Sequence, residues 1–252
     1  MQSPLFAHTE AQTQDRYALQ NPQMLRVSLT GHDDVLARKG SMVAYQGLIE
    51  FDGEYQTRGQ HNARAHTGEG LELMRCSGQG TVYFANLSQH VHVIDVDHDG
   101  LTVDGAYVLA LDSTLHWDTI AVDSHTGVSG TGAYNLVITG RGKVALMTSG
   151  QPLMLQVTPQ TPVNADADAV VAWSTSLRVN MQAPTSSSSV WRRRGSTGEG
   201  WELAFSGQGY ALVQPSELLP PQGAEIGQGL MAQYGVGQQG AHARNQGNIW
   251  SN

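Results

Sequence analysis

The chain has 252 residues, enough to bury a substantial core as one large β domain or as two or three small modules. Charged residues make up only 14% of it, against about 25% in typical domains, and its 29 glycines favour many tight turns. A net charge of −8 argues against nucleic-acid binding through a broad basic surface and against adsorption to anionic membranes.

A few further features bear on compartment and membranes. Cys76 is the single cysteine, which excludes an intrachain disulfide and fits a reducing compartment. The first residues lack the basic start and the apolar core of a secretory signal. Because no apolar run approaches the roughly 18 residues that span a bilayer, we expect a cytoplasmic protein with no membrane span.

In chain order, residues 1–23 come first; they are polar and rich in glutamine, and they predict a lead-in arm with an irregular or short helical piece. From Met24 onward, apolar residues alternate with polar ones at Leu25, Val27 and Leu29. A period of two places side chains on one face of an extended chain, so this pattern predicts the first strand.

The rest of the domain is organised around an apolar segment that occurs three times. Each copy has an apolar run ending around an alanine, a polar or glycine-containing break, and then alternating apolar and polar residues. The copies of this organising segment are Met42–Phe51, Val108–Trp117 and Val170–Val179. Their alanines, Ala44, Ala110 and Ala172, are 66 and 62 residues apart. The alternation is typical of a half-buried strand.

A second segment follows each copy and has the pattern of a strand, a Gly-x-Gly and another strand. Its copies are Leu73–Phe84, Asn135–Leu146 and Glu202–Val213. The second glycines, Gly80, Gly142 and Gly209, are 62 and 67 residues apart. Because glycine adopts backbone conformations that other residues avoid, we expect the chain to turn sharply at each pair.

Two landmarks that recur in the same order predict an internal triplication. We expect an all-β fold of three antiparallel β-sandwich modules, at about residues 24–96, 97–160 and 161–214. Each module is too small to close its own core comfortably, so the modules should pack side by side or share sheets. Residues 215–252 are rich in Pro, Gln, Gly and Asn and predict a disordered, low-complexity tail.

Several short motifs in this order connect the chain to a known family. They are Gly40-Ser41-Met42-Val43-Ala44, Gly68-Glu69-Gly70, Gly78-Gln79-Gly80, Asp99-Gly100, Val171-Ala172-Trp173, Gly198-Glu199-Gly200 and Gly207-Gln208-Gly209. Through them, residues 24–214 resemble the altered-inheritance-of-mitochondria protein 24 family. The resemblance implies three tandem β modules similar to the tryptophan RNA-binding attenuator protein, arranged around a ring-like or trimeric core. It implies no catalytic residues and no cofactor.

The acidic run Asp95-Val96-Asp97-His98-Asp99-Gly100 matches the opening of a calcium loop. Asp95, Asp97 and Asp99 would supply hard oxygen donors at alternate positions. However, Ala106 stands where a bidentate glutamate belongs, and the flanking residues predict strands instead of helices. The favoured interpretation is therefore a hairpin that turns at Asp99-Gly100 with the aspartates on its solvated face, and we predict no metal site.

Other candidate sites have simpler explanations. Cys76 shares its register with Ile138 and Phe205, which predicts a core residue and not a nucleophile. His90 and His92 alternate on one strand, where exposed histidines are commoner than zinc ligands. The sequence contains no G-x-S-x-G motif for a nucleophilic serine.

The one dense basic cluster is Arg192, Arg193 and Arg194, next to Trp191. These residues could bind a phosphate or an acidic partner, with the indole as a stacking face. A solvated loop is the simpler interpretation, because short charge runs usually stay hydrated.

These observations favour a non-catalytic, β-rich scaffold or interaction protein that self-assembles. We expect a homo-oligomer, with a trimer favoured by the resemblance, and an unidentified protein or small-ligand partner. One alternative is a small-molecule enzyme with its site in a cleft between modules, which requires a convergent pocket with a perturbed Asp or Glu. The other is an RNA-binding ring protein, which the acidic balance opposes.

Overall fold

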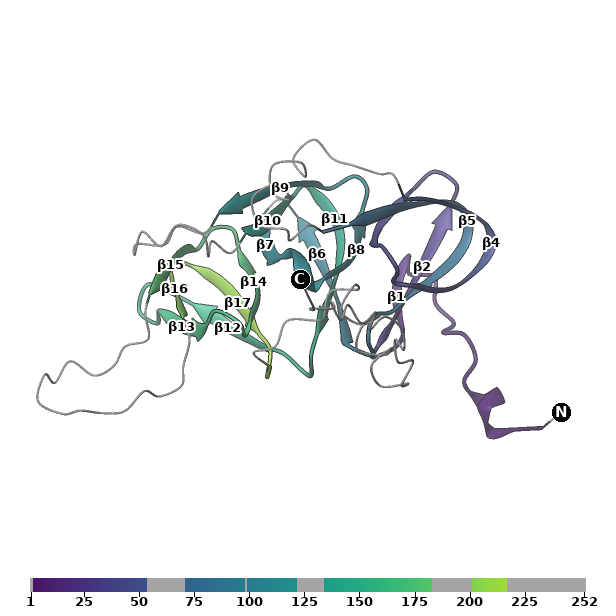
Figure 1. The fold of residues 1–252 in the computed structure, drawn as a ribbon, viewed down its shortest axis with the longest axis horizontal. Coiled ribbons are helices and arrows are strands. Elements are labelled where there is room, and N and C mark those ends of the chain that lie inside the picture. The colour runs from purple at the N-terminus through teal and green to yellow at the C-terminus, as the bar shows by residue number, and fades with distance from the viewer. Residues whose placement is uncertain (1, 54–70, 98, 122–133, 183–200, 217–252) are drawn as a thin grey trace, which may run out of the picture. The chain divides into compact units, whose positions relative to one another are not determined.

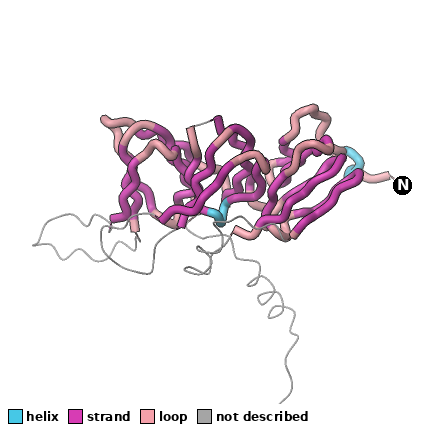
Figure 2. The backbone as a smooth tube through the Cα atoms, turned by 90° about the horizontal axis from the view of Figure 1, so that it is seen from above, coloured by secondary structure: helices cyan, strands magenta, loops and turns pink. Residues whose placement is uncertain are grey.

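The computed structural model describes residues 2–53, 71–97, 99–121, 134–182 and 201–216. The chain divides into two units, residues 1–220 and 221–252, and all described residues lie in the first. This part is built of β-strands, with only two short 3₁₀ helices, Pro4–Ala7 and Gly105–Tyr107 (Figures 1 and 2). The predicted all-β class is confirmed. None of the described helices is long and apolar enough to cross a membrane.

The first sheet has eight antiparallel strands and is nearly closed into a barrel. In order across the sheet they are β1 (Tyr17–Asn21), β2 (Met24–Thr30), β5 (Leu73–Phe84), β3 (Val35–Arg38), β8 (Val108–Asp112), β11 (Arg141–Thr148) and β6 (His90–Asp97), with β4 (Met42–Asp52) also paired to β5. The two ends of the sheet meet where the Val91 amide donates to the Pro22 carbonyl at 2.8 Å. Leu25, Cys76 and Phe84 are among the buried side chains that fill its core.

Two further antiparallel sheets complete the described part. The second sheet contains β12 (Leu153–Val157), β17 (Gly209–Val213), β14 (Val170–Ser174), β7 (Leu101–Asp104), β10 (Tyr134–Thr139) and β9 (His116–Ala121), in that order. The third contains β13 (Val163–Asp166), β16 (Glu202–Ser206) and β15 (Arg178–Gln182). The sheets therefore combine strands from distant parts of the sequence.

The three copies of the organising segment have the same irregularity in their strand pairing. In each, the register shifts by one residue just before the alanine. The pairs on either side of the shift are Met42↔Phe84 and Ala44↔Tyr83 in β4, Val108↔Leu146 and Ala110↔Ala145 in β8, and Val170↔Val213 and Ala172↔Leu212 in β14. A bulge of this kind bends a strand and increases its twist. The alanines thus share a backbone environment, although Ala44 is exposed and the other two are buried.

The paired glycines do not all make the sharp turns that the sequence predicts. β5 runs without interruption through Gly78, while β10 and β11 are separated only by Gly140 and belong to different sheets. The backbone φ is +111° at Gly78, +107° at Gly140 and +113° at Gly207. Such positive values favour glycine. The first glycine of each pair therefore bends an extended chain, and at Gly140 it leads the chain from one sheet to another.

Two other expectations change. Asp99-Gly100 is not the turn of a hairpin, because β6 lies in the first sheet and β7 in the second. It is a link between sheets, with Gly100 at a φ of +74°. At the N-terminus, β1 falls within residues 1–23, which we expected to be an arm, and pairs with β2 along one side of the first sheet.

Strands of successive repeats meet at two equivalent pairs, one within the first sheet and one within the second, which we call the first and second junctions. At the first junction, β3 pairs with β8 through Ala37↔Ala110, Leu36↔Leu111 and Val35↔Asp112. At the second, β7 pairs with β14 through Val103↔Ala172, Thr102↔Trp173 and Leu101↔Ser174. Corresponding residues are 66 apart in β3 and β7 and 62 apart in β8 and β14, the spacings of the sequence landmarks.

Candidate functional site

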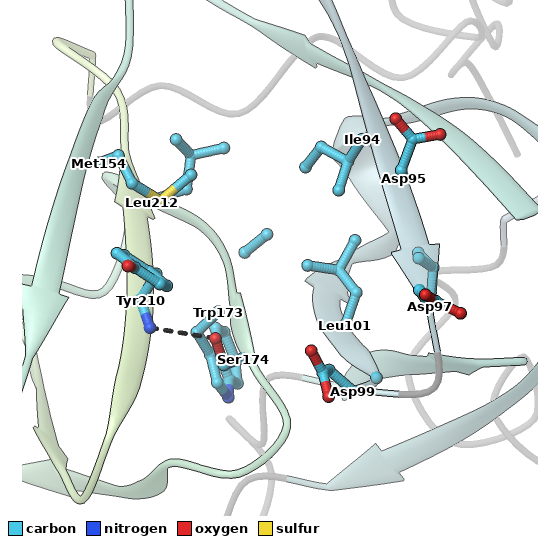
Figure 3. Close-up of a pocket in the computed structure, with 13 residues that line it drawn as sticks. Ile94, Asp95, Asp97, Asp99, Leu101, Met154, Trp173, Ser174, Tyr210 and Leu212 are labelled. Carbon is cyan, nitrogen blue, oxygen red and sulfur yellow. Dashed lines mark hydrogen bonds between the residues drawn. The ribbon is translucent and has the colours of Figure 1, made fainter. Parts of the chain in front are cut away.

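A cavity of about 350 Å³ opens at the second junction, between β6 and β7 on one side and β12, β14 and β17 on the other (Figure 3). Its lining residues are Ile94, Asp95, Val96, Asp97, Asp99, Gly100, Leu101, Met154, Ala172, Trp173, Ser174, Tyr210 and Leu212. A concave site with mainly apolar walls and a few polar groups is the usual form of a small-molecule pocket.

The walls of the cavity are apolar and partly aromatic. Trp173 is held firmly, since its side chain is only 5% exposed and its ring meets Phe205 edge to face at 5.7 Å. Tyr210 and Met154 are about half exposed, at 50% and 52%, and Figure 3 shows them on the same side of the cavity as Trp173. Leu101 faces them from β7. Tyr210 and Met154 thus form a solvated rim, while Trp173 is fixed in the buried core beside Phe205.

The three aspartates that we considered as calcium ligands do not lie together. Asp95 and Asp97 alternate with Ile94 and Val96, so their carboxylates lie on the face of β6 turned away from the cavity (Figure 3). Asp95 forms an ion pair with Lys143, its cross-strand partner on β11. Among the described residues, no group of three His, Cys, Asp or Glu side chains could hold a metal ion.

Each outward aspartate has a cross-strand cation. Asp97 lies 3.7 Å from Arg141 Nε, and both side chains are largely exposed. Exposed ion pairs of this kind contribute at most about 1 kcal/mol. Their role is local, on the solvated face of the first sheet.

Asp99 is placed differently, because it follows β6 in the link to β7. Its carboxylate points across the opening of the cavity toward Trp173 and Ser174 (Figure 3). The Ser174 hydroxyl accepts a hydrogen bond from the Tyr210 amide at 3.0 Å. The Thr175 amide, next in the chain, donates to the Gly100 carbonyl at 3.4 Å. These backbone contacts hold the β14–β15 turn opposite Asp99.

The first junction has the corresponding hydrogen bonds but contains a bound cation from the chain itself. The Ser113 amide donates to the Asp34 carbonyl at 3.4 Å, as Thr175 does to Gly100. The Lys143 amide donates to Asp112 Oδ2 at 2.8 Å, as Tyr210 does to Ser174. The guanidinium of Arg16 lies in this junction.

Arg16 is held by three groups. It forms an ion pair with Asp112, places Nε 2.7 Å from the Asp33 carboxylate, and donates from Nη2 to the Asp34 carbonyl at 3.0 Å. The guanidinium carbon also lies 5.3 Å from the centre of the Tyr17 ring. By the repeat spacings, Asp33 corresponds to Asp99 and Asp112 to Ser174.

The surroundings of Asp33 lower the pKa of its carboxyl. Burial raises its pKa, but hydrogen bonds from the Thr30 amide and hydroxyl, together with the charge of Arg16, outweigh burial and lower the pKa below its usual value of 3.8. We did not identify Arg16, Asp33 or Asp112 from the sequence. The 66-residue spacing between Asp33 and Asp99 was the available signal.

The remaining candidates lie elsewhere. Cys76 is fully buried in the core of the first sheet, which confirms its predicted position, and burial together with Asp34 raises its pKa to about 12. The His92 ring is 2.8 Å from the Thr148 hydroxyl, and burial, then His90, lowers its pKa. The basic cluster of Trp191, Arg192, Arg193 and Arg194 lies outside the described residues.

Comparisons with known proteins agree with this architecture. A crystal structure of protein SPYM3_0169 from Streptococcus pyogenes matches with a TM-score of 0.60 and 18% identity, over 86% of this chain and 97% of that one. At this identity the likeness shows the fold alone. No curated protein matches the chain. A family model described as mitochondrial biogenesis AIM24 matches residues 17–216, and the chain therefore belongs to the AIM24 family.

Proposed function

We propose that the protein is a non-catalytic scaffold built from three copies of one β unit, and that it self-assembles by adding strands across copies of the chain. The observation that carries this proposal is the exposed apolar surface of β4. Met42, Val43 and Tyr45 are 38%, 55% and 49% exposed. Their counterparts in β8, Val108, Leu109 and Leu111, are at most 1% exposed.

The difference in burial has a direct cause in the strand pairing. β8 and β14 each pair on both sides, with β11 and β17 on one side and with β3 and β7 on the other. Within the described residues, β4 pairs only with β5. An edge strand with unpaired backbone groups and apolar side chains is a template for another strand.

The complementary strand is β13, the counterpart of β3 and β7. It pairs with β16 through Val163↔Phe205 and Ala165↔Leu203, as β3 pairs with β5. Its other side has no strand partner within the described residues. Continuing the repeat spacings places β13 of one copy against β4 of the next, with Ala165 opposite Ala44.

Such a contact is head to tail, because the two surfaces that meet are different. Head-to-tail contacts form a closed ring where the rotation permits and an open filament otherwise. We propose a ring, with a trimer favoured by the family resemblance. Burial of the exposed β4 side chains would stabilise it by roughly 25 cal/mol for each Å² of apolar surface removed from water.

The oligomeric state and a cysteine cross-link test the proposal together. Light scattering should give a homo-oligomer at all accessible concentrations, and a sharp monomer would contradict self-assembly. Ala44→Cys and Ala165→Cys proteins, mixed after dissociation and reassembly, should form a disulfide-linked heterodimer. Directly opposed residues of antiparallel strands are about 4.5–5.5 Å apart at Cα, which suits a disulfide.

The matched control replaces Ala165→Cys by Asn164→Cys, one residue along β13. In the proposed register this thiol is displaced along the strand and points to the opposite face. Cys76 is buried and should not interfere in the folded protein. Equal cross-linking of the two pairs would contradict the register even if the protein is oligomeric.

A further inference from the structure

We propose that the cavity at the second junction binds a small organic cation, with its ammonium, amidinium or guanidinium group between Asp99 and Ser174 and its apolar body against the cavity walls. This site goes beyond self-assembly and does not depend on it, since both sides of the cavity belong to one chain. The argument rests on the two junctions, which have corresponding hydrogen bonds but different contents.

The first junction shows what this geometry binds. There a guanidinium, that of Arg16, lies between Asp33 and Asp112 and over the ring of Tyr17. A carboxylate on either side of a planar cation supplies charge-assisted hydrogen bonds, which are the stronger class in proteins. The chain thus contains an occupied example of the site.

The second junction keeps one of the two carboxylates and has a cavity in place of the bound guanidinium. Asp99 stands at the position of Asp33, and Ser174, a neutral acceptor, replaces Asp112. No described ion pair involves Asp99. Arg16 has no described counterpart here, and the cavity of about 350 Å³ is present instead.

The chemistry of the lining selects for a cation with an apolar body. Among the described lining residues, Asp99 is the acidic side chain that points across the opening, and none is a lysine or an arginine. The half-exposed Tyr210 offers an aromatic ring that attracts cations electrostatically. Leu101, Leu212 and Met154 complete an apolar surface that a hydrocarbon or aromatic body would remove from water. An anion at the same place would be repelled by Asp99.

Benzamidine is a suitable probe, because benzamide and benzoate have nearly the same shape but are neutral and anionic. Calorimetric titration of the full-length protein should show benzamidine binding at least about tenfold more tightly than benzamide, the value of one hydrogen bond to a charged group. Benzoate should not bind. Equal affinity for benzamidine and benzamide, or no binding of benzamidine at millimolar concentration, would overturn the proposal.

Two variants locate the cation. Asp99→Asn should weaken benzamidine binding about tenfold and leave benzamide unchanged. Asp97→Asn is the matched control, because it removes the same charge only two residues away, on the face of β6 that is turned away from the cavity. It should leave both affinities unchanged. An equal loss in the two variants would show that only the general negative field attracts the probe, and it would refute the site.

A gain of affinity provides the sharpest test. Ser174→Asp makes the second junction resemble the first, where Asp112 accepts the Lys143 amide as Ser174 accepts the Tyr210 amide. This variant should bind benzamidine several-fold more tightly than the wild type and should not bind benzamide better. Circular dichroism and the oligomeric state check that each variant is folded. Unchanged or weaker benzamidine binding by folded Ser174→Asp would contradict the equivalence of the junctions.

Discussion

Replacing Arg16 by methionine should destabilise the domain, because the buried Asp112 carboxylate would lose its cation. The Asp112 carboxylate is only 11% exposed, and its cation would be lost while an apolar chain of similar length remains. Removing one partner of a buried pair costs about 3–5 kcal/mol. Because Arg16 is 26% exposed and the Lys143 amide still donates to Asp112, we expect the lower part of that range or slightly less, about 2–3 kcal/mol.

The assay is thermal and urea unfolding of a double-mutant cycle. For a domain of this size, the expected loss lowers Tm by roughly 5–10 °C. Asp112→Ser gives the first junction the serine that the second junction has at this position. The Arg16→Met, Asp112→Ser double variant should lose about 1–2 kcal/mol less unfolding free energy than the sum of the two single losses. Additive effects, or a loss below about 0.5 kcal/mol for Arg16→Met, would refute the view that Arg16 neutralises this carboxylate.

Three further predictions concern Asp33, Cys76 and Gly78. Because the folded pKa of Asp33 is lowered, its carboxylate stabilises the fold above the usual pKa of 3.8 and loses that contribution as pH falls through the folded pKa. Asp33→Asn should therefore make stability depend less steeply on pH in this range, and an unchanged pH profile would contradict the assignment. Cys76, with a pKa of about 12 and no exposed surface, should react with a thiol reagent at pH 8 only as fast as the protein unfolds, so rapid labelling of the native state would exclude the core position. Gly78→Ala should destabilise by about 2 kcal/mol or more, since its Cβ would lie 2.1 Å from the Leu48 carbonyl oxygen; chemical denaturation measures the loss, and a neutral effect would show that β4 and β5 can separate there.

Repeat spacing was the strongest information in the sequence. Ala44, Ala110 and Ala172 have the same bulge in their strands, and Cys76 is in the core at the predicted register. These features depend on local pattern, which the period of two reports directly. The burial of the alanines depends on which strand pairs on the other side, and no local pattern reports that.

The glycine pairs and the acidic run were misinterpreted for a related reason. A glycine with positive φ fits a hairpin turn and a bend in a continuous strand equally well, and only the pairing of β5 or β11 distinguishes them. Similarly, the Asp99-Gly100 link has the composition of a hairpin turn, but its two strands enter different sheets. Arg16 could not have been assigned to Asp112, because 96 residues separate them and Arg16 lies outside both repeated segments.

The two junctions show how a repeated architecture can produce a binding site. Both copies keep the strand pairing and the backbone contacts that position an acidic residue, Asp33 in one and Asp99 in the other. In the first copy the cation belongs to the chain, so its binding energy contributes to folding. In the second copy no described side chain supplies it, and the same geometry is free to bind a cation from solution. If the equivalence holds, affinity at the second junction should rise when Ser174 is made acidic and stability at the first should fall when Asp112 is made neutral, which are two measurements of one interaction.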